Sequence, residues 1–434
     1  MKKEKTKTFG TSPAVILMVT SYPPRECGIA TYSNDLKIAL DKKFSQSLSV
    51  IICALETVDE KFEYPEEVIY KLDTSVKEEF KDIAGKINSN DEIKIVHIQH
   101  EFGFFREQEK AFTDFLEEIS KPILITFHTV LPHPGNDMKS LVEKIADCAT
   151  SIMVMTHISA DILCADYGVE ANKITVIAHG THLVSHMSNK HLKEKYYLKG
   201  RRILTTFGLL GSGKGIKTSL EALPSIIKKF PDVLFLIIGK THPGVIKTEG
   251  EKYRDMLVQT ITEKGLENNV RFINRYLPLN ELLEYLQLSD IYLFTSNDPN
   301  QAVSGTFAYA MSCACPIIST PIPHAKEILT KDTGIIFDFN NSLQLSDAVI
   351  KLLGDDSLRN QMSINTIQKI AFTAWENSAV EHAMLYAKIY ASIIPLKYNL
   401  PPINFKHLEN LTTQTGIVQF SRINHPDFKT GFTL

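Results

Sequence analysis

The chain of 434 residues has little of several features that assign a protein to a class at once. It holds six cysteines and no CxxC pair, and so sparse a set predicts reduced thiols, not a disulfide framework. No run of about 18 apolar residues occurs, so we expect no transmembrane segment. The formal net charge is −3, which offers no field that attracts nucleic acid or a membrane. These absences predict a cytoplasmic globular protein without a nucleic-acid partner.

Two catalytic signatures are also missing. The sequence has no HExxH, the pattern of zinc peptidases, and no GxSxG, the pattern of serine hydrolases. A HxxHE stretch is present, but no third ligand lies nearby in the sequence. We therefore expect neither a metal site nor a cofactor.

What the chain does contain is a repeated unit, in which a short apolar strand precedes a helical stretch. Strand candidates lie at 15–20, 48–55, 93–100, 122–130, 151–156 and 173–180, and after a polar interruption at 203–210, 233–240, 270–277, 290–296 and 315–321. Nearly continuous apolarity is typical of strands that are buried on both faces of a parallel sheet. The pattern predicts an α/β fold with two doubly wound, Rossmann-like domains, residues 1–190 and 191–390, facing across a cleft. Residues 391–434 form a tail without a complete βα unit.

The strongest signal for a site is the segment FGLLGSGKG, which follows the first strand of the second series. Lys214 lies among four glycines: Gly208, Gly211, Gly213 and Gly215. Glycines let backbone N–H groups approach an anion, while the lysine and the next helix N-terminus add positive charge. The spacing differs from that of a P-loop. The segment predicts a phosphate cradle, and a turn needed only for packing is the alternative.

A second segment, QAVSGTFAYAM, begins a helix after a later strand. Ser304, Gly305 and Thr306 stand at its start, and Gln301 precedes them. A serine at this place often serves only as a helix cap, but the amides at a helix N-terminus also bind sugars or phosphates. The position after a parallel strand leaves both interpretations open.

The first domain offers polar residues after its own strands. Gly28 begins a helix, and the neighbouring Arg25 suits either a bidentate phosphate contact or a surface salt bridge. His100 and Glu101 end one strand, and two further histidines, His128 and His179, follow other strands. We interpret these groups as hydroxyl-binding or proton-transfer residues.

These segments resemble the retaining glycosyltransferases of the GT-B fold, the family 4-like or group 1 enzymes. FGLLGSGKG, DVLFLIIGKTHP and SGTFAYAMSCACPIISTP match its second domain, and PPRECGIATY with HIQHEFGFF look like a bacterial branch. The resemblance covers about residues 15–390. It implies metal-independent transfer of a hexose, mannose or glucose, from a GDP- or UDP-sugar held mainly by the second domain. A saccharide or other hydroxyl acceptor is implied for the first domain.

The resemblance also implies a role for each candidate residue. Lys214 and His128 are the implied catalytic residues, with Lys214 stabilising the leaving diphosphate. The donor or its phosphates are expected at Gly28, Gly208, Gly211, Gly213, Gly215, Arg275, Gln301, Ser304, Gly305, Thr306 and Tyr309. The acceptor is expected at Arg25, His100, Glu101 and His179.

Three positions depart from the family pattern. Leu209 stands where an arginine is usual, and Gln301 and Tyr309 replace a pair of glutamates, the second of which grips the ribose. Two alternatives therefore stay open: a glycoside phosphorylase that uses inorganic phosphate, and a sugar-binding homologue without catalysis. The tail resembles the opening of an all-helical carbohydrate-active domain, so a separate chain that supplies such a domain is a possible partner.

Overall fold

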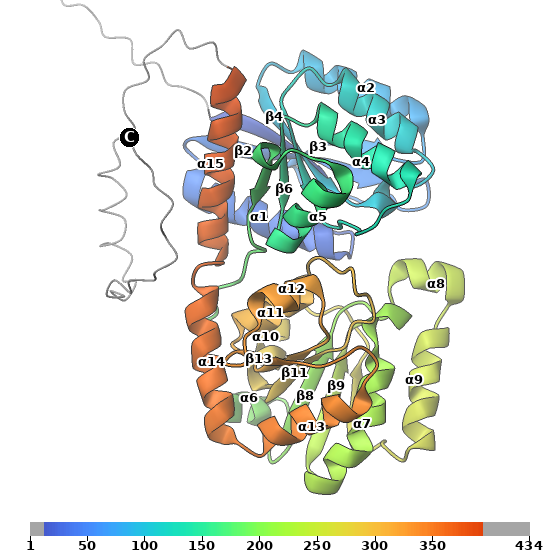
Figure 1. Cartoon of the computed structure of the whole chain (residues 1–434), viewed down its shortest axis with the longest axis vertical. Coiled ribbons are helices and arrows are strands. Elements are labelled where there is room, and N and C mark those ends of the chain that lie inside the picture. Colours follow the sequence, from blue (N-terminus) through green and yellow to red (C-terminus); the bar gives the residue numbers. More distant parts are fainter. Residues whose placement is uncertain (1–12, 394–434) are drawn as a thin grey trace, which may run out of the picture. The chain divides into compact units, whose positions relative to one another are not determined.

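The computed structural model describes residues 13–393, which contain two parallel sheets, each covered by helices on both faces (Figure 1). The first sheet has the strand order β3-β2-β1-β4-β5-β6-β7. Its strands are β1 (Ala14–Thr20), β2 (Leu48–Glu56), β3 (Val68–Asp73), β4 (Ile93–His100), β5 (Ile123–Phe127), β6 (Ser151–Val154) and β7 (Ile174–Val176). Its helices are α1 (Gly28–Phe44), α2 (Lys77–Ser89), α3 (Glu109–Glu118), α4 (Asn136–Cys148) and α5 (His157–Tyr167), with short 3-10 turns η1 (Phe102–Phe104) and η2 (Ala171–Lys173).

The second sheet has the order β10-β9-β8-β11-β12-β13. Its strands are β8 (Arg202–Phe207), β9 (Val233–Ile238), β10 (Val270–Ile273), β11 (Ile291–Phe294), β12 (Ile317–Ser319) and β13 (Gly334–Ile336). The helices after β7 are α6 (Asn189–Lys195), η3 (Ser212–Lys214), α7 (Ile216–Lys229), α8 (Pro243–Glu249), α9 (Lys252–Glu263), α10 (Leu279–Leu288), α11 (Gly305–Ser312), α12 (Pro323–Ile328), α13 (Ser342–Leu353), α14 (Asp356–Ile370) and α15 (Trp375–Ile393).

The predicted fold class is confirmed, since both sheets are parallel and doubly wound. Each strand candidate contains a strand. All of these strands except β7 and β10 lie inside a sheet, where helices cover both faces and favour apolar runs. The sequence missed β3 and β13, which lie at sheet edges. β3 alternates between half-buried and exposed side chains before its buried end, and β13 has three residues, so neither has a long apolar run.

The last helix packs on the first domain. Trp375 and Tyr386 of α15 are buried in one apolar cluster with Ile16 and Met18 of β1. The range 191–390 expected for the second domain therefore ends in a helix whose buried side chains belong to the core of the first. This is a tertiary fact that the order of elements does not reveal. The predicted start of a helical domain in the tail lies, from residue 394 on, outside the described residues.

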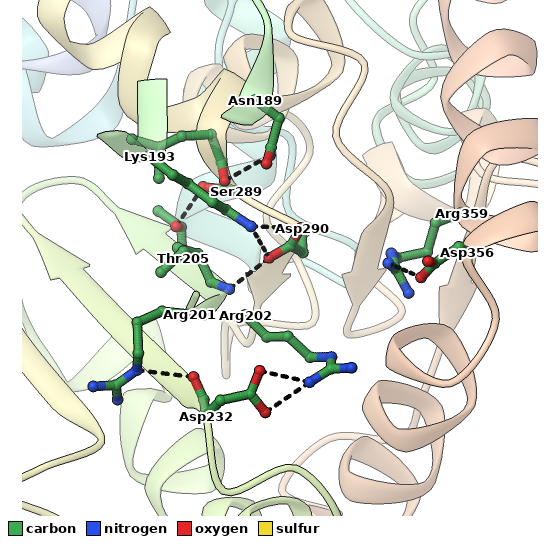
Figure 2. Close-up of polar contacts among 12 residues, drawn as sticks. Asn189, Lys193, Arg201, Arg202, Thr205, Asp232, Ser289, Asp290, Asp356 and Arg359 are labelled. Atoms are coloured by element: carbon green, nitrogen blue, oxygen red, sulfur yellow. Dashed lines mark hydrogen bonds and ion pairs between the residues drawn. The ribbon is translucent and has the colours of Figure 1, made fainter. Parts of the chain in front are cut away.

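Ion pairs anchor the second sheet at the amino ends of its strands (Figure 2). Asp290, just before β11, accepts the backbone N–H of Ile203 at 2.6 Å and pairs with Lys193 of α6 at 2.7 Å. Asp232, just before β9, accepts from Arg202 at 2.7 Å. Because all strands are parallel, these contacts lie at the amino ends of the strands. The loops at the carboxyl ends, where ligands bind in such folds, are not involved in them.

Two further facts bear on the expectations from composition. All six cysteines are free thiols. Between residues 13 and 393, no helix is both long enough and apolar enough to cross a membrane.

Candidate functional site

The candidate site begins where the second sheet changes direction, between β8 and β11. In doubly wound sheets, ligands bind at this switch point, outside the carboxyl ends of the strands. The glycine-rich loop after β8 and the loop after β11 hold each other there: Thr295 Oγ1 donates to the carbonyl of Lys214 at 2.9 Å, and the N–H of Asn297 donates to the carbonyl of Gly213 at 2.8 Å. The sequence places both loops, and the fold brings them together.

Two glycines of this loop are required by its geometry. Gly215 has φ 60°, and a Cβ there would lie 1.9 Å from the carbonyl oxygen of Thr295. Gly208 has φ 131°, and a Cβ there would lie 3.1 Å from Thr306 Cγ2 and 3.3 Å from Lys214 Nζ. Gly208 therefore marks the point where the lysine ammonium and the start of α11 approach each other. Gly211 and Gly213 meet no such constraint, because a Cβ on either makes no contact closer than 3.5 Å.

Among residues 13–393, the Lys214 ammonium has no carboxylate partner. Burial lowers the pKa of its ammonium, and no carboxylate within residues 13–393 offsets this effect. Lys214 is half-buried, and a partly desolvated charge without a partner is unfavourable, so this group is expected to meet an anion from outside the chain. This supports the interpretation of the loop as a phosphate cradle.

The N-terminus of α11 faces the same point. The Ser304 hydroxyl caps the helix by accepting the N–H of Phe307 at 3.4 Å, and the N–H of Ser304 donates to His324 Nδ1 at 3.2 Å. In the described part of the chain, the N–H groups of Gly305 and Thr306 have no acceptor. The two interpretations of this segment are thus compatible, because Ser304 is a cap while the next two amides are free to bind an anion.

His179 adjoins this helix start. Its Nδ1–H donates to the carbonyl of Gly180 at 2.8 Å, so Nε2 carries the lone pair. A Cβ on Gly305 would lie 3.6 Å from that Nε2. Burial lowers the pKa of His179, which keeps the ring neutral and able to accept a hydroxyl proton.

The ring of Tyr32 contacts the rings of both His128 and His179. The ring centroid of Tyr32 is 5.1 Å from that of His128 and 5.2 Å from that of His179. His128 Nε2 lies 2.8 Å from Gln99 Oε1, which makes Nε2 the donor and leaves Nδ1 as an acceptor. Burial lowers the pKa of His128 to about 3, so this imidazole is neutral near pH 7.

Three predicted residues are held by neighbouring side chains. Arg25 pairs with Glu60 at 2.9 Å. Arg275 makes a bidentate ion pair with Glu281. Gln301 Oε1 accepts the hydroxyl of Ser296 at 2.8 Å. Their expected roles at the donor or acceptor stay predictions.

Tyr309 of α11 and Gly28 of α1 differ in how closely they are constrained. The Tyr309 hydroxyl donates to Asp35 Oδ2 of α1 at 2.7 Å, and the same oxygen lies 3.2 Å from His182 Nε2. Burial and this carboxylate raise the pKa of Tyr309, so it remains a neutral donor. Gly28 is the first residue of α1, and a Cβ there would meet open space. The geometry therefore ties Tyr309 to the first domain and gives no steric reason for a glycine at position 28.

The other two predicted acceptor residues lie at the carboxyl end of β4. Glu101 Oε1 accepts the N–H of Phe102 at 3.0 Å, and Oε2 accepts the hydroxyl of Thr129 at 2.7 Å. Burial raises the pKa of Glu101. His100 is 1% exposed and is packed among phenylalanine rings on the other face of the sheet from Gln99.

Several residues of the cluster carried no signal in the sequence. Tyr32 and Gln99 contact His128, and His324 contacts the α11 start. Each lies in a segment that reads as ordinary helix or strand, and its role depends on a partner far away in the chain. Within residues 13–393, no group of three or more His, Cys, Asp or Glu residues is arranged to hold a metal ion.

Comparison with known proteins adds a family to this geometry. Residues 188–369 match the model of the family described as glycosyl transferases group 1, and this range contains the loops after β8 and β11. A D-inositol 3-phosphate glycosyltransferase of Corynebacterium diphtheriae is 22% identical over 253 residues, 56% of this chain and 57% of the relative. A GDP-mannose-dependent monoacylated alpha-(1-6)-phosphatidylinositol monomannoside mannosyltransferase of Corynebacterium glutamicum is 25% identical over 154 residues, 34% of this chain and 37% of the relative. The matches therefore span 57% of the length of the first relative and 37% of the length of the second.

A solved structure extends the likeness to both domains. HepE of Anabaena in complex with UDP-glucose superposes with a TM-score of 0.64 at 15% identity, over 87% of this chain and 100% of that one. At this identity the likeness shows the fold, which is GT-B. Residues 188–369 are therefore similar to the group 1 glycosyl transferases, and both domains share the GT-B fold.

Proposed function

We propose that the protein is a retaining hexosyltransferase, which moves mannose or glucose from a GDP- or UDP-sugar to a saccharide or other hydroxyl acceptor. The observation that carries the proposal is the ammonium of Lys214, which has no counter-ion among the described residues and lies beside the free amides of α11. A diphosphate supplies the negative charge that this point lacks. The UDP-glucose in the HepE structure and the GDP-mannose in the name of one relative support a nucleotide sugar as donor.

The proposed chemistry follows from charge. As the bond between the hexose and the diphosphate breaks, negative charge grows on the leaving oxygen. Lys214 and the amides of Gly305 and Thr306 are already oriented, so they stabilise this charge without reorganisation. His128, neutral and with Nδ1 available, accepts a hydroxyl proton of the transferred sugar in a hydrogen bond. Transfer without a metal is part of the proposal.

Calorimetry with UDP, GDP, ADP and inorganic phosphate tests the donor. We expect UDP or GDP to bind, and the corresponding hexose nucleotide to be consumed when a saccharide acceptor is present. The proposal fails if no nucleotide binds and an oligosaccharide is cleaved only when phosphate is added.

That failure would favour a glycoside phosphorylase. The cradle of Lys214 and α11 also suits inorganic phosphate, and the side chains of Gln301 and Tyr309 are bonded to Ser296 and Asp35 instead of facing a ligand. Release of a hexose 1-phosphate distinguishes this reaction. A sugar-binding homologue without catalysis predicts neither nucleotide binding nor turnover. A cytoplasmic location and a helical partner domain remain predictions from the sequence.

A further inference from the structure

A row of polar side chains is buried in the first domain, on the face of the sheet that α15 covers. His97 and Gln99 belong to the central strand β4, and both are 0% exposed. Their side chains share one face of the sheet, because strand residues two apart point the same way. Polar groups in such a core are unfavourable unless each has a hydrogen-bond partner, so the partners of this row show what it does.

Three hydrogen bonds connect the row from α15 to the proposed catalytic histidine. His97 Nδ1 lies 2.8 Å from the hydroxyl oxygen of Tyr386. His97 Nε2 lies 3.1 Å from Gln99 Nε2. Gln99 Oε1 lies 2.8 Å from His128 Nε2. Two side chains of β4 thus connect the Tyr386 hydroxyl to the imidazole of His128.

The amide of Gln99 determines the direction of each bond. An amide nitrogen donates and an amide oxygen accepts, so Gln99 Nε2 donates to His97 Nε2, which carries the lone pair. Burial lowers the pKa of His97 and His128, so both rings are neutral near pH 7. The single proton of His97 is therefore on Nδ1 and is donated to the Tyr386 oxygen. At the other end, His128 donates Nε2–H to Gln99 Oε1 and keeps its lone pair on Nδ1.

The Tyr386 oxygen is what keeps the proton of His97 on Nδ1. Without that acceptor, a buried N–H would lose its partner, which is unfavourable. The proton is then better placed on His97 Nε2, because Thr126 Oγ1 lies 2.7 Å from this nitrogen and can accept it. The Thr126 hydroxyl in turn has Met153 Sδ at 3.8 Å as its own acceptor.

Moving this proton reverses the rest of the row. A protonated His97 Nε2 requires the oxygen of the Gln99 amide to face it, so the amide turns over. Its NH₂ group then donates to His128 Nε2, and the proton of His128 moves to Nδ1. In that tautomer, Nδ1 can no longer accept a hydroxyl proton of the transferred sugar.

We infer that Tyr386 is a positioning residue: by accepting the proton of His97, it fixes the tautomer in which His128 Nδ1 is an acceptor. The use of this tautomer in catalysis rests on the proposed function, whereas the tautomer itself is a property of the protein without substrate. The last described helix therefore sets the proton position on a histidine that follows β5.

The test removes one hydroxyl and observes the tautomer directly. Proton–nitrogen NMR spectra of the full chain with isotope-labelled histidine distinguish a protonated ring nitrogen from one with a lone pair, and the His128→Asn variant identifies the signals of His128. We expect Nε2–H in the wild type and Nδ1–H in Tyr386→Phe. For the hexose nucleotide, kcat/KM should fall about tenfold in Y386F, the loss of one hydrogen bond to the sugar.

Two controls separate this effect from a general disturbance of the core. Tyr390→Phe makes the same change on the same helix at a side chain that is 37% exposed. Thr126→Val removes a buried hydroxyl that contacts His97 but leaves the Tyr386 acceptor in place. Both variants should keep Nε2–H on His128 and the wild-type kcat/KM.

The inference is overturned if His128 carries its proton on Nδ1 in the wild type, a measurement that needs no variant to fold. It is also overturned if folded Y386F keeps Nε2–H on His128, if T126V changes the tautomer as well, or if the tautomer changes without loss of kcat/KM. An unchanged tautomer and rate in Y386F, with turnover of a hexose nucleotide, leave the proposed function intact. A change of tautomer in a protein that turns over no hexose nucleotide supports the control by Tyr386 and contradicts the proposed function.

Discussion

Replacing Lys214 by methionine removes the ammonium group but keeps an unbranched side chain of similar size. The ammonium lies beside Gly208 and Thr306 and forms no ion pair with any described residue, so none of these residues loses such a pair in the variant. If this group stabilises the leaving diphosphate, kcat falls by about 10²–10³, the loss found when one preorganised group is removed from a developing charge. Initial rates with the hexose nucleotide identified by calorimetry measure this loss.

The same substitution is expected to keep or raise the stability of the protein without ligand, although it lowers kcat. Burial holds the pKa of Lys214 in the folded state below its ordinary value of 10.5, so the unfolded chain binds more protons between these two values. Stability of the wild type therefore rises with pH across this window, and the full penalty of the buried charge is present below it. We expect K214M without ligand to be at least as stable as the wild type at pH 7, and this advantage to vanish above about pH 10.5.

Bound nucleotide is expected to reverse the relative stability of the wild type and K214M. A nucleotide at about 100 times its Kd stabilises the wild type by about 2.7 kcal/mol, and K214M should gain much less. Lys217→Met is the control, because Lys217 is 61% exposed and its side chain lies 3.9 Å from Glu221. Urea unfolding with and without UDP measures both effects. If folded K214M keeps the wild-type kcat and nucleotide affinity, Lys214 is not at the site.

Three further predictions concern neighbouring groups. Gly215→Ala forces a Cβ to within 1.9 Å of a backbone carbonyl at φ 60°, so urea unfolding should show a loss of at least about 1–3 kcal/mol, whereas Gly213→Ala should be nearly neutral. Tyr309→Phe removes the 2.7 Å hydrogen bond to Asp35 and should cost about 1–3 kcal/mol, and an unchanged unfolding midpoint would show that the contact does not stabilise the protein. Because the pKa of His128 is lowered to about 3, its titration should not appear in the pH dependence of kcat between about pH 5 and 8. A fall in wild-type kcat at acidic pH within this range that is absent in His128→Asn would contradict the assignment.

Much of the fold follows from local sequence. Apolar runs predict the buried strands because a strand covered on both faces has no solvent-exposed side. The glycine–lysine loop can also be located from local sequence, although the contacts that require glycine at 208 and 215 come from Thr306 and Thr295 in a distant segment. β3 was missed because its buried and exposed side chains alternate over most of its length, and β13 was missed because its apolar run is short.

The site was predictable only in part, for a physical reason. A helix start and a lysine can be identified from neighbouring residues, but an ion pair or hydrogen bond is decided by distance in space. Tyr309 bonds to Asp35, 274 residues away, and Arg25 pairs with Glu60. No local pattern distinguishes a free side chain from one held in this way.

By itself, the sequence determined the two doubly wound sheets and located the glycine-rich loop around Lys214, for which anion binding stays a prediction, because both depend on short-range patterns of apolarity and glycine. The tertiary structure decided which side chains surround that loop and which are held elsewhere. It also decided that α15 returns to the first domain, where the Tyr386 hydroxyl lies 2.8 Å from His97 Nδ1, 289 residues earlier in the chain. Burial of that helix against such distant strands is a long-range packing outcome, and only the folded chain reveals it.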